Sequence, residues 1–310
     1  MPFFSVVIPL YNKQNYIAGT IESVLGQDFS DFELIIVEDC STDSSAAMVE
    51  TFDSPKLRMI RHEKNKGLSA ARNTGIRNAN AEYIAFLDAD DQWHPQFLSE
   101  ISSLIDKNPD ASLFATCYEE IYPGNVSLRP RFNCEIANGI VTDFFECNLG
   151  QPIYCPSSLC VQKSVFSEIG YYDEAITFGE DVDFNIRANV VFRLAWSAKS
   201  LAYYRMHSEN QITNSTIGNK TITDFDSYED LAFSNKPLKK YLDFHRYIMA
   251  KHYRNEGNEL MFAKMLDGIS HSGLNLRQRI LLRLPAVALR SIKIWKNMLL
   301  RMGIKPTSYS

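Results

Sequence analysis

The chain has 310 residues, of which 45% are hydrophobic and 22% are charged, so disorder, collagen and a coiled coil are excluded and about two domains are expected. The formal net charge of −5 is unevenly distributed, because residues 271–310 hold eight Lys or Arg and no Asp or Glu. The rest of the chain has the other 24 of the 32 basic residues and all 37 acidic ones, a net charge of −13. A uniformly basic nucleic-acid binder is therefore excluded, and we expect no nucleic-acid partner.

The first third of the chain alternates between apolar, β-rich runs and helical segments. Continuous apolar strands joined by single helices predict βαβ units, and hence an α/β fold with a mainly parallel, Rossmann-like sheet covered by helices on both faces. In such a fold ligands bind beyond the carboxyl ends of the strands. The expected strands are Phe4–Leu10, Phe32–Val37, Leu57–Ile60 and Tyr83–Leu87, and the expected helices are Ile17–Leu25, Ser44–Thr51 and Ala70–Asn78.

The pattern of the remaining chain is mixed and then helical. A helix is expected from His94-Pro95 to about Asp106, with Pro95 in its first turn. Residues 213–223 are rich in Asn, Ser, Thr and Gly, which predicts a mobile loop, and the chain reads as helical after Asp224. Between these regions we expect strands at Leu113–Cys117, Leu159–Gln162, Leu194–Trp196 and Leu201–Arg205, and helices at Thr142–Cys147, Lys163–Ile169 and Val182–Ala188.

The cysteines and the amino terminus bear on location. No Cys-x-x-Cys pair and no zinc-like spacing occurs, so we expect reduced, buried thiols in a cytoplasmic protein. The first residues lack a basic stretch and contain Pro9, which indicates a first strand and not a signal peptide. No stretch approaches ~18 uninterrupted apolar residues. The six cysteines are Cys40, Cys117, Cys134, Cys147, Cys155 and Cys160.

Three common motifs of α/β proteins are absent from the sequence. No G-x-G-x-x-G follows the first strand, no G-x-x-x-x-G-K-[ST] occurs, and there is no G-x-S-x-G. These absences weigh against a dinucleotide-binding enzyme of the usual type, a P-loop enzyme and an α/β-hydrolase. The sheet therefore serves another ligand.

The fourth expected strand ends in the acidic run Asp88-Ala89-Asp90-Asp91. Three carboxylates in four residues repel one another, so they persist in a crevice only where a cation or hydrogen-bond donors offset their charge. Hard oxygen ligands backed by a diphosphate are typical of Mg²⁺ and Mn²⁺ sites. The alternative is a solvated acidic turn in which Asp91 caps the next helix.

Other strand ends carry groups suited to a nucleotide. A carboxylate of Glu38-Asp39 can accept hydrogen bonds from a uracil ring or from ribose, and Tyr11 offers an aromatic face for a base. Lys66 and Arg72 bring two cations to the loop and helix start between Asn65 and Asn73, suited to phosphate or base contacts. The alternatives are that Tyr11 packs in the core and that Arg72 is a surface helix residue.

These motifs together resemble glycosyltransferase family 2, whose members have the GT-A fold and invert the anomeric configuration. The resemblance covers roughly the first 205 residues in consistent order and spacing. The family often has glycine where Cys40 stands, and a small thiol is expected to fit there. The matching segments are Ser5 to Asn12, Val37 to Asp43, Asn65 to Gly75, Phe86 to Asp91 and Phe178 to Phe184.

The resemblance implies a role for each matching position. Asp88 is implied to contact the ribose, and Asp90 to bind a divalent ion, Mn²⁺ or Mg²⁺, that bridges the diphosphate. Asp181 is implied to be the general base, with Glu180 as the close alternative. Arg205 and His207 belong to a later element whose side chains can reach the diphosphate or the metal. The implied nucleotide site comprises Pro9, Tyr11, Asp39, Lys66, Arg72, Asp88 and Ala89.

The expected function is transfer of a sugar from a nucleotide-sugar, most simply a UDP-sugar, to a hydroxyl of a glycan or lipid-linked acceptor. The alternatives are a catalytically silent nucleotide-sugar-binding subunit and a sugar nucleotidyltransferase. We expect a GT-A domain at residues 1–210, with a nucleotide-binding half (1–110) and an acceptor-binding half (111–210), and a helical region at 211–310.

The basic tail predicts a second kind of contact. Between residues 276 and 302 apolar residues recur at helical spacing beside basic ones, and Pro285 is expected to divide the segment into two helices. A basic amphipathic helix with a Trp is typical of a peripheral contact with an anionic membrane surface. The alternative is a helix packed on the protein or on a second subunit. The residues are Ile280, Leu281, Leu284, Ile292, Trp295, Leu299 and Met302, with Arg283, Arg290, Lys293 and Arg301.

Overall fold

The computed structural model describes residues 1–124, 126–209, 211, 212, 215–270, 273–289, 291, 292 and 295. The chain divides into two compact units. The first comprises residues 1–130, 136–142 and 153–214, and the second comprises residues 131–135, 143–152 and 215–310. Two short segments that precede residue 210 therefore belong to the second unit. The division into a nucleotide-binding and an acceptor-binding half stays a prediction.

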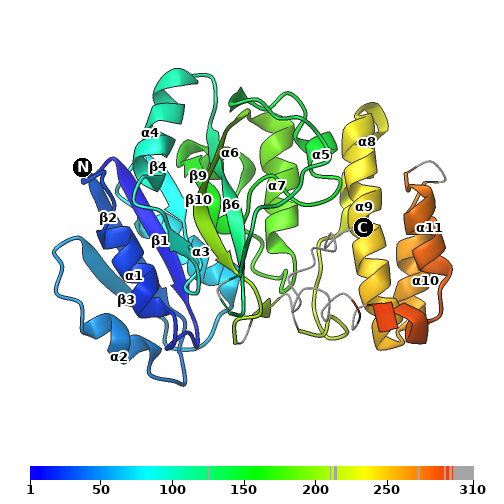
Figure 1. Ribbon diagram of the computed structural model, residues 1–310, viewed down its shortest axis with the longest axis horizontal. Coiled ribbons are helices and arrows are strands. Elements are labelled where there is room, and N and C mark those ends of the chain that lie inside the picture. The colour runs from blue at the N-terminus through cyan, green and yellow to red at the C-terminus, as the bar shows by residue number, and fades with distance from the viewer. Residues whose placement is uncertain are drawn as a thin grey trace. The chain divides into compact units, whose positions relative to one another are not determined.

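A central sheet organises the first unit (Figure 1). The strand order along it is β3-β2-β1-β4-β9-β6-β10-β5, with β7 paired to β6 and β8 to β10. The strands are β1 (Phe4–Leu10), β2 (Phe32–Glu38), β3 (Leu57–Arg61), β4 (Tyr83–Phe86), β5 (Gln92–Trp93), β6 (Leu113–Tyr122), β7 (Val126–Leu128), β8 (Gly139–Ile140), β9 (Leu159–Gln162) and β10 (Leu194–Arg205).

The pairing divides the sheet into a parallel part and a mixed part. β1 runs parallel to β2 and β4, and β2 runs parallel to β3, as the βαβ pattern predicts. β9 lies antiparallel between β4 and β6, whereas β6 and β10 are parallel to each other. The α/β class and the helix-covered sheet are confirmed. The two expected strands Leu194–Trp196 and Leu201–Arg205 are one strand, β10, with register shifts between Ser197 and Ala202.

Helices follow the strands of the first unit where the apolar periodicity places them. Gly26 and Asn108 follow two of these helices as their C-terminal capping residues. The helices are α1 (Ile17–Leu25), α2 (Ser45–Glu50), α3 (Leu68–Asn78), α4 (Phe97–Lys107), α6 (Ser164–Ile169) and α7 (Glu180–Val191).

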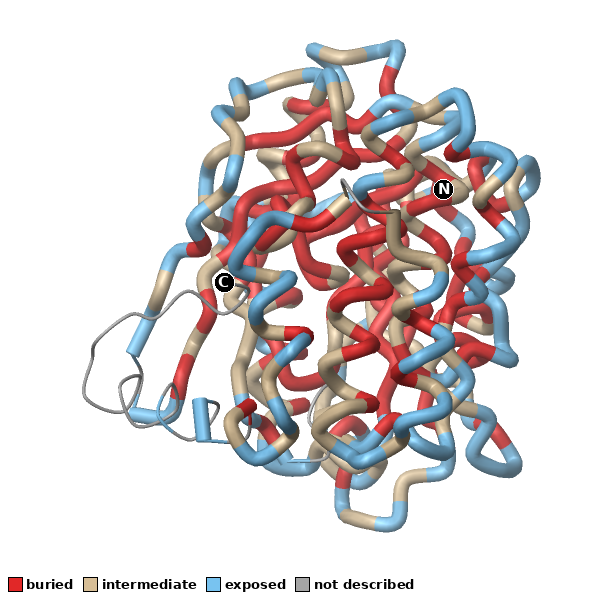
Figure 2. Tube along the Cα trace, turned by 90° about the vertical axis from the view of Figure 1, so that its right-hand side faces the viewer, coloured by how far each residue is buried: buried red, intermediate tan, exposed pale blue. Residues whose placement is uncertain are grey.

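The two faces of the sheet pack against different helices. Phe4, Val6, Ile8 and Leu10 alternate along β1 and share one buried cluster with apolar residues of α1 and α4. Every residue of β1 is buried, and Figure 2 colours the chain by the burial of each residue. On the opposite face Val7 meets α3, and a methyl carbon added to Gly75 would overlap Val7 Cγ1. A glycine in the middle of this helix therefore lets α3 approach the sheet closely.

An aromatic cluster extends the face that α3 covers. Phe86 of β4 meets Phe166 of α6 and Tyr172 edge-on, and Phe184 of α7 stacks on both rings with centroid distances of 5.6 and 4.7 Å. Ring contacts of this kind contribute about 0.5–1.5 kcal/mol each beyond the area they bury. The cluster fixes the start of α7 beside the carboxyl end of β4.

The second unit is helical around the long helix α9. Asn235, Asn258 and Asn275 cap helices by accepting a hydrogen bond from a backbone amide. Phe144 and Phe145 of α5 pack on Tyr241 of α9. The helices are α5 (Phe144–Cys147), α8 (Glu229–Ser234), α9 (Lys236–Glu256), α10 (Glu259–Asp267) and α11 (Leu276–Arg283).

The prediction that all cysteines are reduced and buried is wrong in this structure. Cys134 and Cys147 form a disulfide with a Cα–Cα distance of 5.4 Å, and Cys40 is exposed. The pair escapes a search for short motifs because the two residues are 13 positions apart and meet only when residues 131–135 lie against α5. Cys117, Cys155 and Cys160 are free and buried, as expected.

The tail is described only in part. α11 ends at Arg283, and Leu284 has the extended backbone that the following Pro285 favours, which confirms the predicted break. Thr213 and Asn214 of the predicted mobile loop, and Arg290, Lys293, Leu299, Arg301 and Met302 of the tail, lie outside the described residues. Within the described part of the chain, no helix is both long and apolar enough to cross a membrane.

Candidate active site

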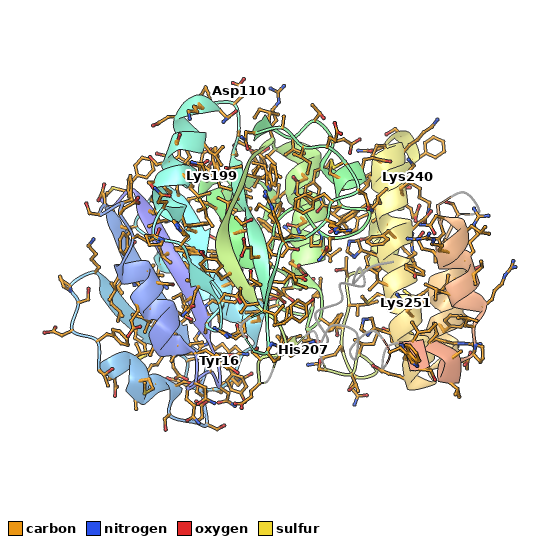
Figure 3. All side chains as sticks on the ribbon, viewed as in Figure 1. Tyr16, Asp110, Lys199, His207, Lys240 and Lys251 are labelled. Atoms are coloured by element: carbon orange, nitrogen blue, oxygen red, sulfur yellow. A yellow bond between two sulfur atoms is a disulfide. The ribbon has the colours of Figure 1, made fainter. Side chains whose placement is uncertain are left out.

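The loops after β1, β2 and β4 meet at the carboxyl ends of these strands. The amide of Asp39, directly after β2, donates to the carbonyl oxygen of Leu10 at the end of β1 (2.9 Å). The amide of Leu87, directly after β4, donates to Val7 of β1 (3.1 Å). Tyr16 and His207, both labelled in Figure 3, lie at this end of the sheet. The sequence-predicted groups are thus brought to one edge.

Asp39 is buried, and three contacts fix its carboxylate. Its carboxylate accepts from the backbone amides of Lys66 and Gly67 (2.8 Å each) and lies 2.6 Å from His62 Nδ1. These contacts fix the loop that leads into α3, and His62 in turn lies 2.9 Å from Thr74 Oγ1 of that helix. The carboxylate is therefore rigidly oriented, whereas the side chain of Lys66 is exposed.

The loop after β1 presents the predicted aromatic group to solvent. Tyr11 is 41% exposed, so it is not a core residue. Next to it Asn12 has a positive φ of 52° and accepts a hydrogen bond from the amide of Thr42 (2.8 Å), which joins this loop to the one after β2. Cys40 also has a positive φ (61°), the backbone region that favours the glycine often found there in the resembled family.

Pro9 and Ala89 are buried and contribute no polar side chain. Pro9 pairs with Val37 in the sheet, and the carbonyl oxygen of Ala89 accepts from Thr20 Oγ1 (3.0 Å). Their implied part in nucleotide binding stays a prediction.

Arg72 is 1% exposed and joins two acidic clusters, so it is not a surface helix residue. Its guanidinium lies 2.8 Å from Asp88 and 2.5 Å from Glu180, residues 16 and 108 positions away in the sequence. Burial lowers its pKa, but Asp88 and Glu180 outweigh this and raise the pKa above its ordinary value. Burial raises the pKa of Asp88, a change that Arg72 opposes and Asp90 reinforces. Arg72 therefore stays charged and holds the two clusters together.

Asp90 is paired with a lysine that the sequence analysis did not single out as a site residue. Lys13 Nζ lies 2.7 Å from Asp90 Oδ2, and both side chains are nearly buried. The hydroxyl of Ser208 also donates to Asp90. Lys13 stands in a loop without a motif of its own, and its only signal is its place three residues after β1.

Asp91 has a structural role instead of a ligand-facing one. Its carboxylate accepts from Ser157 Oγ (2.5 Å) and from the amide of Arg205 (2.8 Å), and it is fully buried. Burial, with repulsion from Asp90 and Asp88, raises its pKa well above the usual range. The helix-capping alternative is not what the structure shows, since Gln96 precedes α4 as its capping residue.

The second acidic cluster opens α7 with Glu180, Asp181 and Asp183. Glu180 is paired with Arg72, and Asp183 accepts from both Nε and Nη2 of Arg187 (2.9 and 2.7 Å). Among the described residues no cation lies within ion-pair distance of the half-buried Asp181. Burial and the charge of Glu180 raise the pKa of Asp181 to about 6. Arg72 and the backbone amides at the start of the helix act in the opposite direction but do not cancel the increase. Asp181 is therefore the carboxylate best suited to take up a proton near neutral pH.

Arg205 and His207 lie at the end of β10, close to the first cluster. Arg205 Nε donates to the carbonyl oxygen of Asp90 (3.2 Å), and its guanidinium lies 5.4 Å from the ring centre of Tyr16. His207 has a positive φ of 60°, and its amide donates to Gln211 (2.9 Å). A direct contact of either side chain with a diphosphate stays a prediction.

The oxygen ligands available at this site fit a divalent ion that is held mainly by the phosphate groups of a bound substrate. Within the described residues no three His, Cys, Asp or Glu side chains are grouped as a metal site. Asp91 is fully buried on Ser157 and a backbone amide, and Asp88 is paired with Arg72, which leaves Asp90 as the hard oxygen ligand for an ion. Mg²⁺ and Mn²⁺ are commonly bound through one or two carboxylates plus phosphate oxygens. A site with Asp90 as its carboxylate matches this pattern, not that of a site built from protein ligands alone.

The sheet and the carboxylates at its strand ends are those of an α/β protein with a GT-A-like fold. Residues 5–170 match the family described as "Glycosyl transferase family 2", and the chain belongs to that family. This confirms the resemblance drawn from the sequence.

Curated relatives include proteins named for polysaccharide synthesis. "Putative teichuronic acid biosynthesis glycosyltransferase TuaG" of Bacillus subtilis (strain 168) is 39% identical over 94 residues, 30% of this chain and 37% of that protein. "Putative colanic acid biosynthesis glycosyl transferase WcaA" of Escherichia coli (strain K12) is 36% identical over 141 residues, 42% of this chain and 50% of that protein. The chain spans about a third of the length of the first three curated relatives (37%, 32% and 32%).

Two solved structures share the fold. S. aureus TarS 1–349 in complex with UDP-GlcNAc has a TM-score of 0.67 at 20% identity, over 97% of this chain and 92% of that chain. Mannosyltransferase PcManGT from Pyrobaculum calidifontis, in complex with GDP-Man and Mn²⁺, has a TM-score of 0.59 at 16% identity, over 96% of this chain and 84% of that chain. At these identities the likeness shows the GT-A-like fold alone.

Proposed function

We propose that this chain is an inverting, metal-assisted glycosyltransferase. Its donor is a nucleotide-sugar, most simply a UDP-sugar, and its acceptor is a hydroxyl of a glycan or lipid-linked oligosaccharide in cell-surface polysaccharide synthesis. The observation that carries the proposal is that Arg72 joins the acidic cluster after β4 to the acidic cluster at the start of α7. The names of TuaG and WcaA and the UDP-GlcNAc bound to TarS support this choice.

The donor is proposed to bind along the loops after β1, β2 and β4. Asp39 accepts from the base, Tyr11 provides an aromatic surface beside it, and Asp88 accepts from the ribose. Lys66 and Arg72 add positive charge, which favours the diphosphate. The fixed position of the Asp39 carboxylate supports its role at the base. An acceptor that cannot move favours a nucleotide base with an N–H group facing it over a base without one.

Asp90 is proposed to hold a divalent ion, Mn²⁺ or Mg²⁺, together with the diphosphate. When bound, such an ion stabilises the negative charge that develops on the leaving diphosphate. Arg205 and His207 are proposed to add contacts to the same group. Both residues are close in sequence to Ser208, whose hydroxyl donates a hydrogen bond to the Asp90 carboxylate.

Asp181 is proposed as the general base. The acceptor hydroxyl gives its proton to the Asp181 carboxylate while its oxygen forms the new bond to the anomeric carbon. The bond from that carbon to the phosphate oxygen breaks, and both electrons leave with the nucleoside diphosphate. A base on the face opposite the leaving group gives inversion. Glu180 is less suited to this role, because it is paired with Arg72.

Titration of the purified chain with UDP-sugars and Mn²⁺ tests the proposal. Calorimetry is expected to show metal-dependent binding of at least one UDP-sugar, and Asp90→Asn is expected to abolish the metal dependence. The matched control is Asp110→Asn, an exposed carboxylate at the opposite end of the sheet in Figure 3, which should bind like the original. Unchanged metal-dependent binding by Asp90→Asn would contradict the role of Asp90.

Turnover separates the proposal from its alternatives. Slow release of free sugar from a UDP-sugar without acceptor is expected of a transferase, and a silent binding subunit releases none. A nucleotidyltransferase would instead form a sugar nucleotide from a nucleoside triphosphate and a sugar phosphate. Assaying both reactions on one preparation decides among the three.

The tail is proposed to bind an anionic membrane surface at the cytoplasmic face. Leu282 of α11 is buried and the helix contacts α9, which accounts for one side of the helix. Leu276 and Ile280 are nevertheless 72% and 50% exposed, and Val287 beyond Pro285 is 72% exposed. The exposed arginines of α11, which suit anionic lipid, are Arg277, Arg279 and Arg283.

Sedimentation with liposomes tests the membrane proposal. The full chain is expected to pellet with anionic vesicles and less with neutral ones, and Ile280→Asp should reduce the pelleted fraction. Binding that ignores both lipid charge and this substitution would contradict it. A dimer that Ile280→Asp dissociates, seen by light scattering, would favour a second subunit as the partner of this helix.

A further inference from the structure

The ammonium of Lys13 makes three hydrogen bonds, as many as it has protons. Nζ donates to Asp90 Oδ2 (2.7 Å), to the carbonyl oxygen of Glu209 (2.7 Å) and to Ser208 Oγ (3.1 Å). Its backbone is also fixed, because the amide of Lys13 donates to Ser45 Oγ (2.7 Å). The ammonium of Lys13 is therefore held firmly against Asp90, the carboxylate to which the proposed function assigns the metal.

We propose that Lys13 competes with the divalent ion for Asp90, so that the ion binds well only together with the nucleoside diphosphate. This inference rests on the proposed function, since it assumes that Asp90 is the metal ligand. It assigns to Lys13 control over the order in which metal and donor bind, a role that the clusters themselves do not provide.

Elementary electrostatics gives the direction of the effect. A divalent ion that approaches Asp90 alone must displace the ammonium from a carboxylate that is only 10% exposed, or must accept a positive charge close by. A diphosphate removes this conflict, because its oxygens offer the ammonium new partners while they bind the ion. The affinity for the metal should therefore rise in the presence of the nucleotide, and by linkage the affinity for the nucleotide rises with metal by the same factor.

The same contacts tie the segment after β10 to the lysine. Besides the bonds from Lys13 to Ser208 and Glu209, Asn15 Nδ2 donates to the Glu209 carboxylate (3.0 Å). Transfer of the ammonium from Asp90 to a diphosphate changes two of the bonds that hold residues 208 and 209. The position of this segment is thus coupled to occupancy of the metal site.

Binding of Mn²⁺ to the nucleotide-free full chain, followed by the electron paramagnetic resonance signal of the free ion, tests the inference. Lys13→Met is expected to bind Mn²⁺ at least tenfold more tightly than the original chain, because it removes the competing charge. Lys13→Arg keeps a cation and should bind as weakly as the original. Lys64→Met, a change at an exposed lysine of another loop, is the matched control and should also leave the affinity unchanged.

Saturating UDP completes the experiment. The original chain should gain at least tenfold in Mn²⁺ affinity when UDP is added, and Lys13→Met should gain less. Lys13→Gln serves as a second neutral variant, and circular dichroism verifies that each variant is folded. Equal Mn²⁺ affinity of the original and both neutral variants overturns the inference while leaving metal-dependent donor binding, and hence the proposed function, intact. No Mn²⁺ binding by any variant, with or without UDP, overturns both.

Discussion

Two clusters of three carboxylates in four residues stand at this site, and they are neutralised differently. In the first, Asp88 and Asp90 each face a cation, and Asp91 is buried on hydrogen-bond donors. In the second, Glu180 and Asp183 face arginines, whereas Asp181 has no ion pair among the described residues. The first cluster is thus arranged to hold positive charge, and the second leaves one carboxylate able to accept a proton.

The comparison depends most on Asp181. Replacement by Asn should lower the turnover number by about 10²–10⁴-fold, because the amide cannot act as a base. Binding of the UDP-sugar should survive, and calorimetry on the same preparation measures it. Near-normal turnover would move the role of base to Glu180.

The pH dependence sharpens the same point. With a pKa of about 6, Asp181 is protonated below that pH, so kcat/KM should fall about tenfold per unit on the acid side and level off above it. The raised pKa means that the folded state disfavours the charged carboxylate of Asp181. The free energy of unfolding therefore falls as the pH rises from 3.8, the ordinary pKa of aspartate, to about 6. Asp181→Asn should therefore raise the melting temperature at pH 8 and change it little at pH 4. A uniform shift at both pH values would contradict the assignment.

Arg72 joins the clusters, and its removal should have the largest effect on stability. Arg72→Met leaves Asp88 and Glu180 without their buried cation, a change that costs about 3–5 kcal/mol in comparable cases. Urea unfolding measures the loss. Arg77→Met, at an exposed arginine of the same helix 3.6 Å from Glu174, is the control and should cost less than about 0.5 kcal/mol. Similar losses of unfolding free energy for both variants would show that Arg72 does not hold the two acidic clusters together.

A substitution of Ser157 tests the role of Asp91, the buried member of the first cluster. Its hydroxyl donates to Asp91 and accepts from the amide of Asp88, so Ser157→Ala leaves both groups short of a partner. The free energy of unfolding should drop by about 1–3 kcal/mol, as measured by urea titration. Ser127→Ala, at an exposed serine, provides the baseline. A loss no larger than that baseline would mean that water replaces the hydroxyl.

Asp183 should give the smallest effect. Asp183→Asn removes the ion pair with Arg187, but that guanidinium keeps the carbonyl oxygens of Ile169 and Tyr171 as acceptors (2.8 and 3.0 Å). Because asparagine keeps a side-chain oxygen that can accept from Arg187, a loss of only about 1 kcal/mol is expected in urea unfolding, with turnover nearly unchanged. A hundredfold loss of turnover would break the distinction between Asp183 and Asp181.

Local patterns predict much of the fold and the site. Apolar runs interrupted by turn residues place β1, β2, β3 and α1 to within a residue or two, because each is decided by neighbours in the sequence. The acidic runs are visible for the same reason. The contacts that join them are not, since Arg72 meets Glu180 across 108 positions and Lys13 meets Asp90 across 77. Such pairings depend on strand order, and nothing in their local sequence distinguishes a buried cation from an exposed one.

The closeness of α3 to β1 has a consequence for chemistry. Gly75 allows this helix to rest on Val7, and Arg72 lies one turn earlier on the same helix. A methyl group added at position 75 would lie 2.3 Å from Val7 Cγ1, so either the valine or the helix that carries Arg72 would have to shift. The close packing of one glycine against one valine thus helps to set where the buried guanidinium stands between its two carboxylates.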